Sequence, residues 1–201
     1  MRKRVEDLKA SVKQATDRAW RLMREDYLDL SLKELYAGCM NTSLACQLAG
    51  GAVGKPKDIL LGDDLLDKSI QQQTLQELND EDPYLTIVSF PCDSWTSMSN
   101  AFPEETREFK RKVGKMHIKF VHTVAENCRR RGKHILVEHP LRSQAWSRMP
   151  WLCDENGYTQ SRMGQCACDL VNRAGQPILK PTRWKESADI LIRFLGTYRC
   201  T

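Results

Sequence analysis

The sequence predicts an α/β fold with an open, mostly parallel sheet and helices on both faces. Short, almost continuously apolar runs such as 85–90 are typical of strands buried on both faces. Stretches with apolar residues every three or four positions alternate with these runs, as in βα units. With 201 residues, the chain has the length of one domain of ordinary size.

The N-terminal segment, residues 1–30, is predicted to hold one amphipathic helix over 3–27. Val5, Leu8 and Val12 begin an apolar stripe at spacings of three and four, and no Pro or Gly interrupts it. The other face of this helix is basic. The stripe is too short for a free coiled coil, so we expect the helix to pack on the domain, residues 31–201, or on a partner.

Two βα units are predicted next. The first has a strand over 32–36, a turn at Ala37-Gly38 and a helix over 41–48 that Gly50-Gly51 ends. A strand, a glycine turn and a helix form the usual cradle of a nucleotide-like ligand, although any βα unit can need one turn glycine. The second unit has a strand over 59–61 that ends at Gly62-Asp63-Asp64, followed by a helix over 68–79. Carboxylates there can hold ribose hydroxyls or an adenine amine, or can simply belong to a polar turn.

The strand over 85–90 runs directly into Pro91 and Cys92. Pro91 cannot donate to a ladder, so the strand should stop there. An amphipathic helix over 109–128 and a strand over 135–137 follow, and this strand ends in Glu138-His139-Pro140. A right-handed crossover would make the two strands parallel neighbours. Cys92 and Glu138, 46 residues apart, should then face one crevice at the carboxyl edge of the sheet, where ligands bind in such folds.

The remaining chain is less regular. We predict a short helix over 143–153, a strand over 158–163, a rigid basic and aromatic turn over 180–184 and a closing helix over 188–195. Cys153, Cys166, Cys168 and Cys200 lack the paired spacing of a zinc site, so no metal is expected.

Composition and charge narrow the class of protein. The chain has no apolar run of about 18 residues and no signal-peptide pattern, so we expect no membrane association and an intracellular location, nuclear or cytoplasmic, with its eight cysteines reduced. The net charge is +5, and ten Lys or Arg residues lie between Arg107 and Lys133 against two glutamates. This segment is either a solvated helix face or a surface that contacts phosphates.

Cys92 is a candidate nucleophile. A thiol at the end of a strand and near the start of a helix can have a lowered pKa, because unpaired amide hydrogens favour the thiolate. The structural alternative is an ordinary buried cysteine, which is the commoner situation.

From about residue 32 to 160, the sequence resembles the S-adenosylmethionine-dependent cytosine-5 DNA methyltransferases. The similar motifs are Tyr36-Ala37-Gly38 for their opening glycine turn, Gly62-Asp63 for their adenine contact, Phe90-Pro91-Cys92 for their nucleophile motif and Glu138-His139-Pro140 for their Glu-Asn-Val motif. A variant in retroelement polyproteins, with Glu-His-Pro and a later Lys-Pro-Thr stretch, is more similar still.

The resemblance implies a Rossmann-like fold and a transferase mechanism. Cys92 would add to C6 of a flipped-out cytosine, Glu138 would stabilise the adduct near N3, and C5 would take the methyl group. The resemblance places S-adenosylmethionine against Tyr36, Gly38 and Asp63, with Asp64 as second choice. The implied nucleic-acid contacts, to DNA more than RNA, are Lys110, Arg111, Lys112, Lys115 and Arg183.

The sequence also departs from this family. Only 25 residues separate Gly38 from Asp63, so a strand-helix unit that carries a ribose contact is shortened or missing. Asp93 replaces the glutamine that usually follows the nucleophile, and the segment that reads target sequence is not recognisable. Sequence selectivity would then be supplied elsewhere. The expected partners besides nucleic acid are a separate target-recognition protein or a second copy that associates through the N-terminal helix.

Two other functions stay open. The first is a catalytically inactive nucleic-acid-binding or assembly module of a mobile element. The second is a Cys-His hydrolase with Cys92 as nucleophile and His139 as base.

Overall fold

The computed structural model describes residues 31–165, 171–172 and 174–188. They form a mixed α/β fold whose five strands belong to one open sheet, which confirms the predicted class. The chain divides into two compact units, Met1–Val88 with Thr123–Lys133 and Ser89–His122 with His134–Thr201. The predicted N-terminal helix lies outside the described residues, as does the predicted closing helix beyond its first residue.

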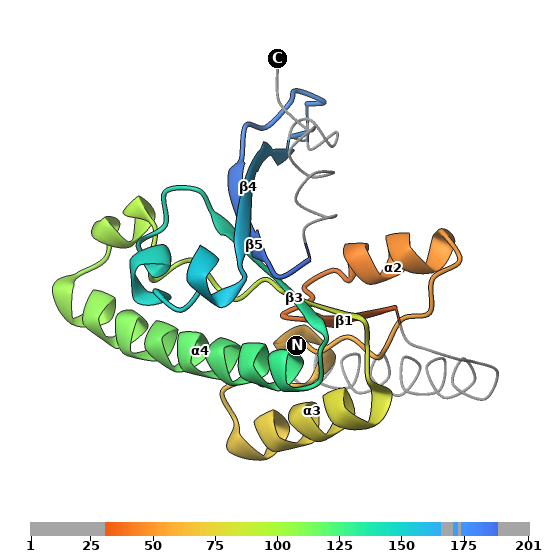
Figure 1. The fold of residues 1–201 in the computed structure, drawn as a ribbon. Helices are drawn as coiled ribbons and strands as arrows, with labels where there is room; N and C mark the ends of the chain where they lie inside the picture. The colour runs from red at the N-terminus through yellow and green to blue at the C-terminus, as the bar shows by residue number, and fades with distance from the viewer. Residues whose placement is uncertain (1–30, 166–170, 173, 189–201) are drawn as a thin grey trace, which may run out of the picture. The chain divides into compact units, whose positions relative to one another are not determined.

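In the first unit, two predicted strands form a parallel pair, and Figure 1 labels the first of them. β1 is Leu32–Leu35 and β2 is Leu85–Val88, with Leu32 opposite Leu85. The helices α2, Asn41–Leu48, and α3, Lys68–Glu81, match the predicted ranges closely. Asp67 caps α3, because its carboxylate accepts a hydrogen bond from the Ser69 amide at 2.7 Å.

Two charged residues in the middle of β1 explain how this buried strand is held. All four residues of β1 are buried, although Lys33 and Glu34 are charged. Successive side chains of a strand point to opposite faces. Lys33 accordingly binds Glu77 and Glu81 of α3, while Glu34 accepts hydrogen bonds from the amide and hydroxyl of Ser43 in α2. The two helices therefore lie on opposite faces of β1.

The predicted strand over 59–61 is wrong. These residues form the 3-10 helix η1, Ile59–Leu61, because the Asp58 carboxylate accepts from the Leu60 amide at 2.8 Å and caps a tight turn. Gly62 ends the turn with a φ of 88°, a value that favours glycine. The apolar run indicated a buried strand, but Ile59 and Leu60 are exposed.

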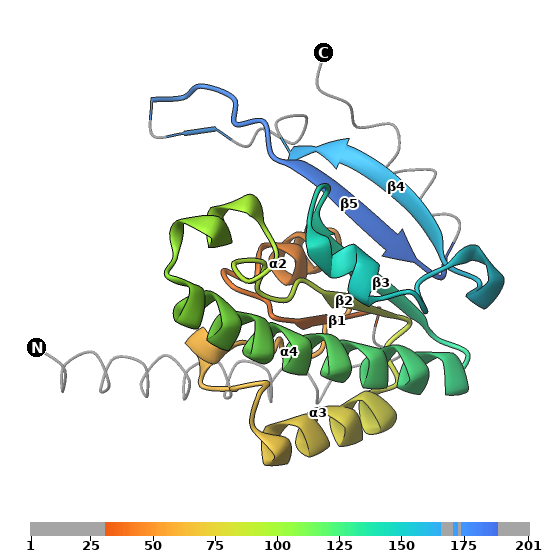
Figure 2. The ribbon, with the colours of Figure 1, turned by 90° about the vertical axis from the view of Figure 1, so that its left-hand side faces the viewer.

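The second unit contains three antiparallel strands (Figure 2). They are β3, His134–Pro140, β4, Thr159–Gly164, and β5, Pro181–Glu186, and β5 pairs with both of the others. The predicted turn over 180–184 is therefore wrong. Pro181 stands at the first position of β5, where no ladder donor is lost, and buried Thr182 and Glu186 fit the alternation of a strand.

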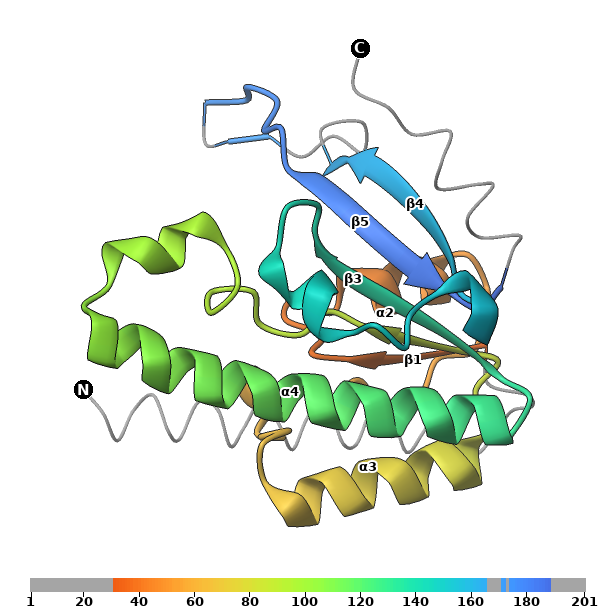
Figure 3. The same cartoon turned by 60° about the vertical axis from the view of Figure 1, so that its left-hand side comes forward.

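Helix α4, Glu104–Arg130, is one uninterrupted helix that begins five residues before the predicted 109–128 (Figure 3). Pro103 and the acidic Glu104 and Glu105 are ordinary signals for a helix start, and Arg129 and Arg130 complement the dipole at its end. The predicted helix over 143–153 is shorter than expected: its helical part is the 3-10 turn η3, Gln144–Arg148, which ends before Pro150. A second 3-10 turn, η4, Asp154–Asn156, follows the predicted range. A further 3-10 turn, η2, covers Ser97–Ala101.

Candidate functional site

Cys92 lies on a turn that is anchored by two buried aromatic side chains of the second unit. Phe90 is 3% exposed and Trp95 is 2% exposed. The Trp95 amide donates to the Cys92 carbonyl at 3.0 Å, and the Trp95 carbonyl accepts from the Gln144 amide at 2.9 Å. The thiol, itself half-buried, is therefore presented from a fixed backbone.

Glu138 acts electrostatically on Cys92, and Lys180 acts on both groups. Burial raises the pKa of the Cys92 thiol, the positive charge of Lys180 opposes this, and the carboxylate of Glu138 adds to it. Burial also raises the pKa of Glu138, against the opposing effects of Lys180 and a hydrogen bond from Ser89. Oε1 of Glu138 is buried and has no hydrogen bond. The Glu138 carboxylate is therefore close enough to act on the Cys92 thiol, and both groups have raised pKa values.

The expected fall in the pKa of Cys92 is wrong, because burial acts in the opposite direction. The physical reason lies in the local chain. The next helical turn, η2, starts only at Ser97 and has five residues, so the described chain directly after Cys92 does not begin a helix. Lys180 is the group whose charge favours the thiolate.

His139 is enclosed by aromatic rings. Its side chain is 0% exposed and lies 4.4 Å from the ring centroid of Phe90 and 5.9 Å from that of Trp146. Burial lowers the pKa of His139 to about 4, and the backbone of Pro91 offsets this only in part. A neutral, enclosed imidazole does not suit the general base that a Cys-His hydrolase needs. The geometry therefore weighs against that function.

Asp93 does not stand as an isolated negative charge beside the thiol. Its carboxylate is paired with Lys110 of α4, whose ammonium also lies 4.6 Å from the ring centroid of Phe102. Although partial burial alone would raise it, the pKa of Asp93 is lowered by the hydrogen bond and charge of Lys110. The Ser94 hydroxyl donates to the Lys110 carbonyl at 2.8 Å. The Pro-Cys loop is thus fastened to the first turns of α4.

In the first unit, the predicted cofactor turn has an unusual backbone. Tyr36, Gly38 and Met40 have φ values of 57°, 53° and 58°, and a positive φ is uncommon for the two non-glycine residues. The Gly38 amide donates to the Asp58 carboxylate at 2.9 Å. Burial raises the pKa of Tyr36, and the charge of Asp64 raises it further. Tyr36 and Asp64 are therefore close together, while the Gly38 amide is already bound by the protein.

The two candidate aspartates after η1 have different environments. Asp63 is 2% exposed, and its carboxylate lies 3.5 Å from the ammonium of Lys57. Lys57 is itself fully buried and binds Glu77 at 2.7 Å. Asp64 is exposed, and its Oδ1 accepts from the Leu66 amide at 2.9 Å. Of the two carboxylates, Asp64 is the one at the surface and Asp63 is part of a buried ion network.

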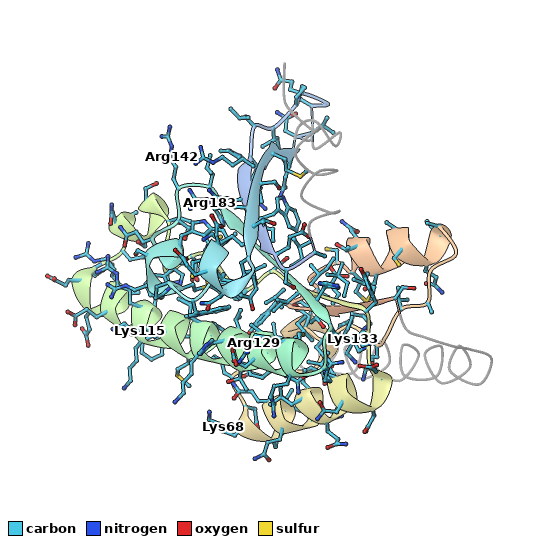
Figure 4. All side chains as sticks on the ribbon, in the orientation of Figure 1. Lys68, Lys115, Arg129, Lys133, Arg142 and Arg183 are labelled. Atoms are coloured by element: carbon cyan, nitrogen blue, oxygen red, sulfur yellow. The ribbon has the colours of Figure 1, made fainter. Side chains whose placement is uncertain are left out.

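The predicted nucleic-acid contacts all lie in the second unit, on two elements. Lys112 and Lys115 on α4 are exposed, Lys110 is held by Asp93, and Arg111 is half-buried. Arg183 comes from β5, where its guanidinium carbon lies 5.3 Å from the ring centroid of Trp146. Figure 4 shows Lys115 and Arg183 among the side chains of this unit.

Sequence reasoning missed three residues of this region as functional candidates. Lys180 was part of a predicted turn, and its effect on Cys92 and Glu138 follows only from the position of β5. Trp146 was part of a predicted helix, although its ring contacts both His139 and Arg183. Arg162 lies opposite Arg183 in the strand register, which no local pattern reveals.

Comparison with known proteins does not assign this chain to a family. No family model and no curated protein matches this sequence. Within the described part of the chain, no group of His, Cys, Asp and Glu side chains could hold a metal ion. None of the described helices combines the length and apolar character needed to cross a membrane.

Proposed function

We propose that this chain acts on nucleic acid, DNA more than RNA, through addition of the Cys92 thiol to a flipped-out cytosine, in a Rossmann-like fold of the cytosine-5 methyltransferase type. The observation that supports the proposal is that the half-buried Glu138 carboxyl acts electrostatically on Cys92 and that its buried Oε1 has no hydrogen-bond partner among the described residues. A carboxyl group held toward its acid form can donate a proton to a ring nitrogen.

Addition of Cys92 to C6 of cytosine needs only Cys92, Glu138 and solvent. Cys92 first gives its thiol proton to solvent. The thiolate then forms a bond to C6, the electron pair of the C5–C6 double bond becomes a C4–C5 double bond, and the pair of the N3–C4 double bond moves to N3. Glu138 gives its proton to N3, which leaves an enamine with a nucleophilic C5. Protonation of C5 by solvent, loss of the original C5 hydrogen, return of the N3 proton and departure of the thiolate restore cytosine. The net result is exchange of the hydrogen on C5.

S-adenosylmethionine, the cofactor that the resemblance implies, would supply the methyl group that C5 takes in place of that hydrogen. Exposed Asp64 beside Tyr36 fits such a ligand, whereas Asp63 and the Gly38 amide are bound to Lys57 and Asp58. The strained turn over 36–40 supports a ligand site, since such backbone conformations gather at functional positions.

Cofactor-free exchange is the test of this chemistry. Cytosine-containing DNA would be incubated with the protein in deuterated water, and loss of the cytosine H5 signal would be followed by NMR. We expect exchange with the natural sequence, none with Cys92→Ser, and a rate reduced by about 100-fold or more with Glu138→Gln. Cys39→Ser, which changes an exposed cysteine of the first unit, is the matched control and should exchange normally. Equal exchange rates with and without Cys92 would overturn the proposal.

A second candidate function is supported by the first unit. Because the Gly38 amide is already bound by Asp58 and Oδ1 of Asp63 by Lys57, the chain could bind nucleic acid without transferring a methyl group. Calorimetric titration with S-adenosylmethionine distinguishes the methyltransferase from the binding module. Salt-dependent DNA binding without cofactor binding or H5 exchange would leave only the binding module.

A further inference from the structure

Two arginines face each other across neighbouring strands of the second unit. Arg162 of β4 and Arg183 of β5 are direct register partners in an antiparallel pair. Side chains of such partners emerge on the same face of the sheet, and like charges in these positions repel each other. Burial lowers the pKa of Arg183, and the charge of Arg162 lowers it further, so the two guanidiniums are close enough to interact.

The protein does not compensate this charge within the described ranges. No ion pair of Arg162 or Arg183 with a carboxylate occurs among residues 31–165, 171–172 and 174–188, and Nε of Arg183 is buried without a hydrogen-bond partner. Lys185, two positions along β5, is a third cation, but its ammonium donates to the Leu152 carbonyl. Burial and the charge of Arg183 lower the pKa of Lys185, and the charge of Asp154 opposes this. An uncompensated pair of guanidiniums costs stability unless an anion binds it.

Arg183 is also held in one orientation. Its guanidinium carbon lies 5.3 Å from the ring centroid of Trp146. The Trp146 ring is fixed in turn, because its Nε1 donates to the Pro140 carbonyl at 2.9 Å. A guanidinium stacked on an aromatic ring keeps its planar set of donors directed at a ligand, which is the geometry suited to phosphate oxygens.

We propose that Arg162 and Arg183 form a phosphodiester clamp that binds the backbone of a nucleic-acid strand across β4 and β5. This inference rests on the proposed function and adds Arg162 of β4 to the surface that Arg183 was expected to contribute. Exposed Arg142 follows β3, and the Leu141 amide donates to the Pro181 carbonyl at 3.0 Å, which keeps this loop beside the start of β5. Figure 4 labels Arg142 and Arg183 in the second unit.

Salt-dependent binding tests the clamp directly. Fluorescence anisotropy with a labelled single-stranded cytosine-containing DNA would be measured over a series of KCl concentrations. Removing one side chain that binds a phosphate should reduce the slope of log K against log salt by about 0.7 for a single strand. We expect this change with Arg162→Gln or Arg183→Gln, and about twice this change with the double variant. Arg183→Lys should keep part of the slope but bind more weakly, because lysine lacks the stacked planar fork.

The matched control is Lys68→Gln on α3, an exposed lysine of the first unit that is also visible in Figure 4. It should leave the slope unchanged. Folding is checked by thermal unfolding, where the Gln variants should be at least as stable as the natural sequence because a repulsion is removed. Slopes of the arginine variants equal to that of Lys68→Gln would overturn the clamp. Equal competition by poly-glutamate at matched charge would also overturn it, since the ligand would then be an acidic polypeptide.

This experiment is independent of the proposed chemistry. Reduced slopes in a protein that shows no H5 exchange would support the clamp and count against the cytosine addition. Normal H5 exchange with unchanged slopes would support the addition and remove the clamp.

Discussion

A Cβ atom on Gly114 would lie 2.7 Å from Nε1 of the Trp95 indole and within 2.9 Å of two further indole atoms. Gly114 therefore leaves the space in α4 that Trp95 occupies. Because the carbonyl of Trp95 holds Gln144 and its amide binds Cys92, this close approach fixes the loop of the candidate nucleophile.

The first prediction is that Gly114→Ala destabilises the protein. Alanine would gain up to about 1 kcal/mol in helix propensity, but overpacking against a rigid indole costs about 1–3 kcal/mol. We expect a net loss of about 1–2 kcal/mol in the free energy of unfolding, measured with urea. Lys112→Ala on the exposed face of α4 is the control and should change stability by less than about 0.5 kcal/mol. A more stable Gly114→Ala protein would show that Trp95 does not pack against this position.

The second prediction separates the two aspartates after η1. Asp63→Asn should destabilise the protein by about 1–3 kcal/mol, because it removes a charged hydrogen-bond acceptor from the buried Lys57 ammonium. Asp64→Asn should leave stability within about 0.5 kcal/mol and should weaken binding of S-adenosylmethionine. Urea unfolding and calorimetric titration measure the two effects. The reverse pattern would place Asp63 at the ligand and Asp64 in the scaffold.

The third prediction concerns pH and His139. The folded-state pKa of about 4 lies below the ordinary value of 6.5, so the unfolded chain binds a proton that the folded chain does not. The stability that this group contributes is fully present above pH 6.5 and is lost as pH falls toward 4, by about 3 kcal/mol in total. His139→Phe should remove this part of the pH dependence. Unfolding free energies at pH 4, 5, 6 and 7 test it, and identical slopes for both proteins would contradict the enclosed, neutral imidazole.

The fourth prediction concerns the ion pair of Asp93 and Lys110. Asp93→Asn should release the Lys110 charge and tighten binding of single-stranded DNA, with a salt slope steeper by about 0.7. Stability should change by less than about 1 kcal/mol, because the pair is partly exposed. Asp82→Asn is the matched control, since Asp82 pairs with Arg131 and Lys133 in the first unit. An equal gain in affinity from both variants would show a general effect of net charge.

Much of the fold could be predicted because its signals are local. The apolar runs at β1 and β2 and the periodicity of α3 and α4 depend on neighbouring residues in the chain. Segment 59–61 could not be assigned in the same way, because a side chain outside the run, Asp58, converts it into a 3-10 turn. The strand at 181–186 was hidden for a similar reason, since its two pairing partners are distant in sequence.

In the candidate site, too, the features that depend on local sequence could be predicted and those that depend on tertiary packing could not. The proximity of Cys92 and Glu138 followed from their positions after predicted strands, and their electrostatic interaction agrees with it. The direction of the Cys92 pKa shift depends on how deeply the sulfur is buried, which a sequence does not express. The separate environments of Asp63 and Asp64 depend on Lys57, a residue that gave no signal as a buried cation.

The two buried lysines of the first unit should be protected from amine-modifying reagents as long as this unit is folded. Lys33 and Lys57 are 0% exposed, and both ammonium groups are bound by carboxylates. Reagents that alkylate or acylate amines should therefore modify exposed lysines such as Lys68 and Lys115 quickly and spare these two. Labelling of Lys33 and Lys57 would then report the opening of this unit in a mixture, without purification and without any assay of function.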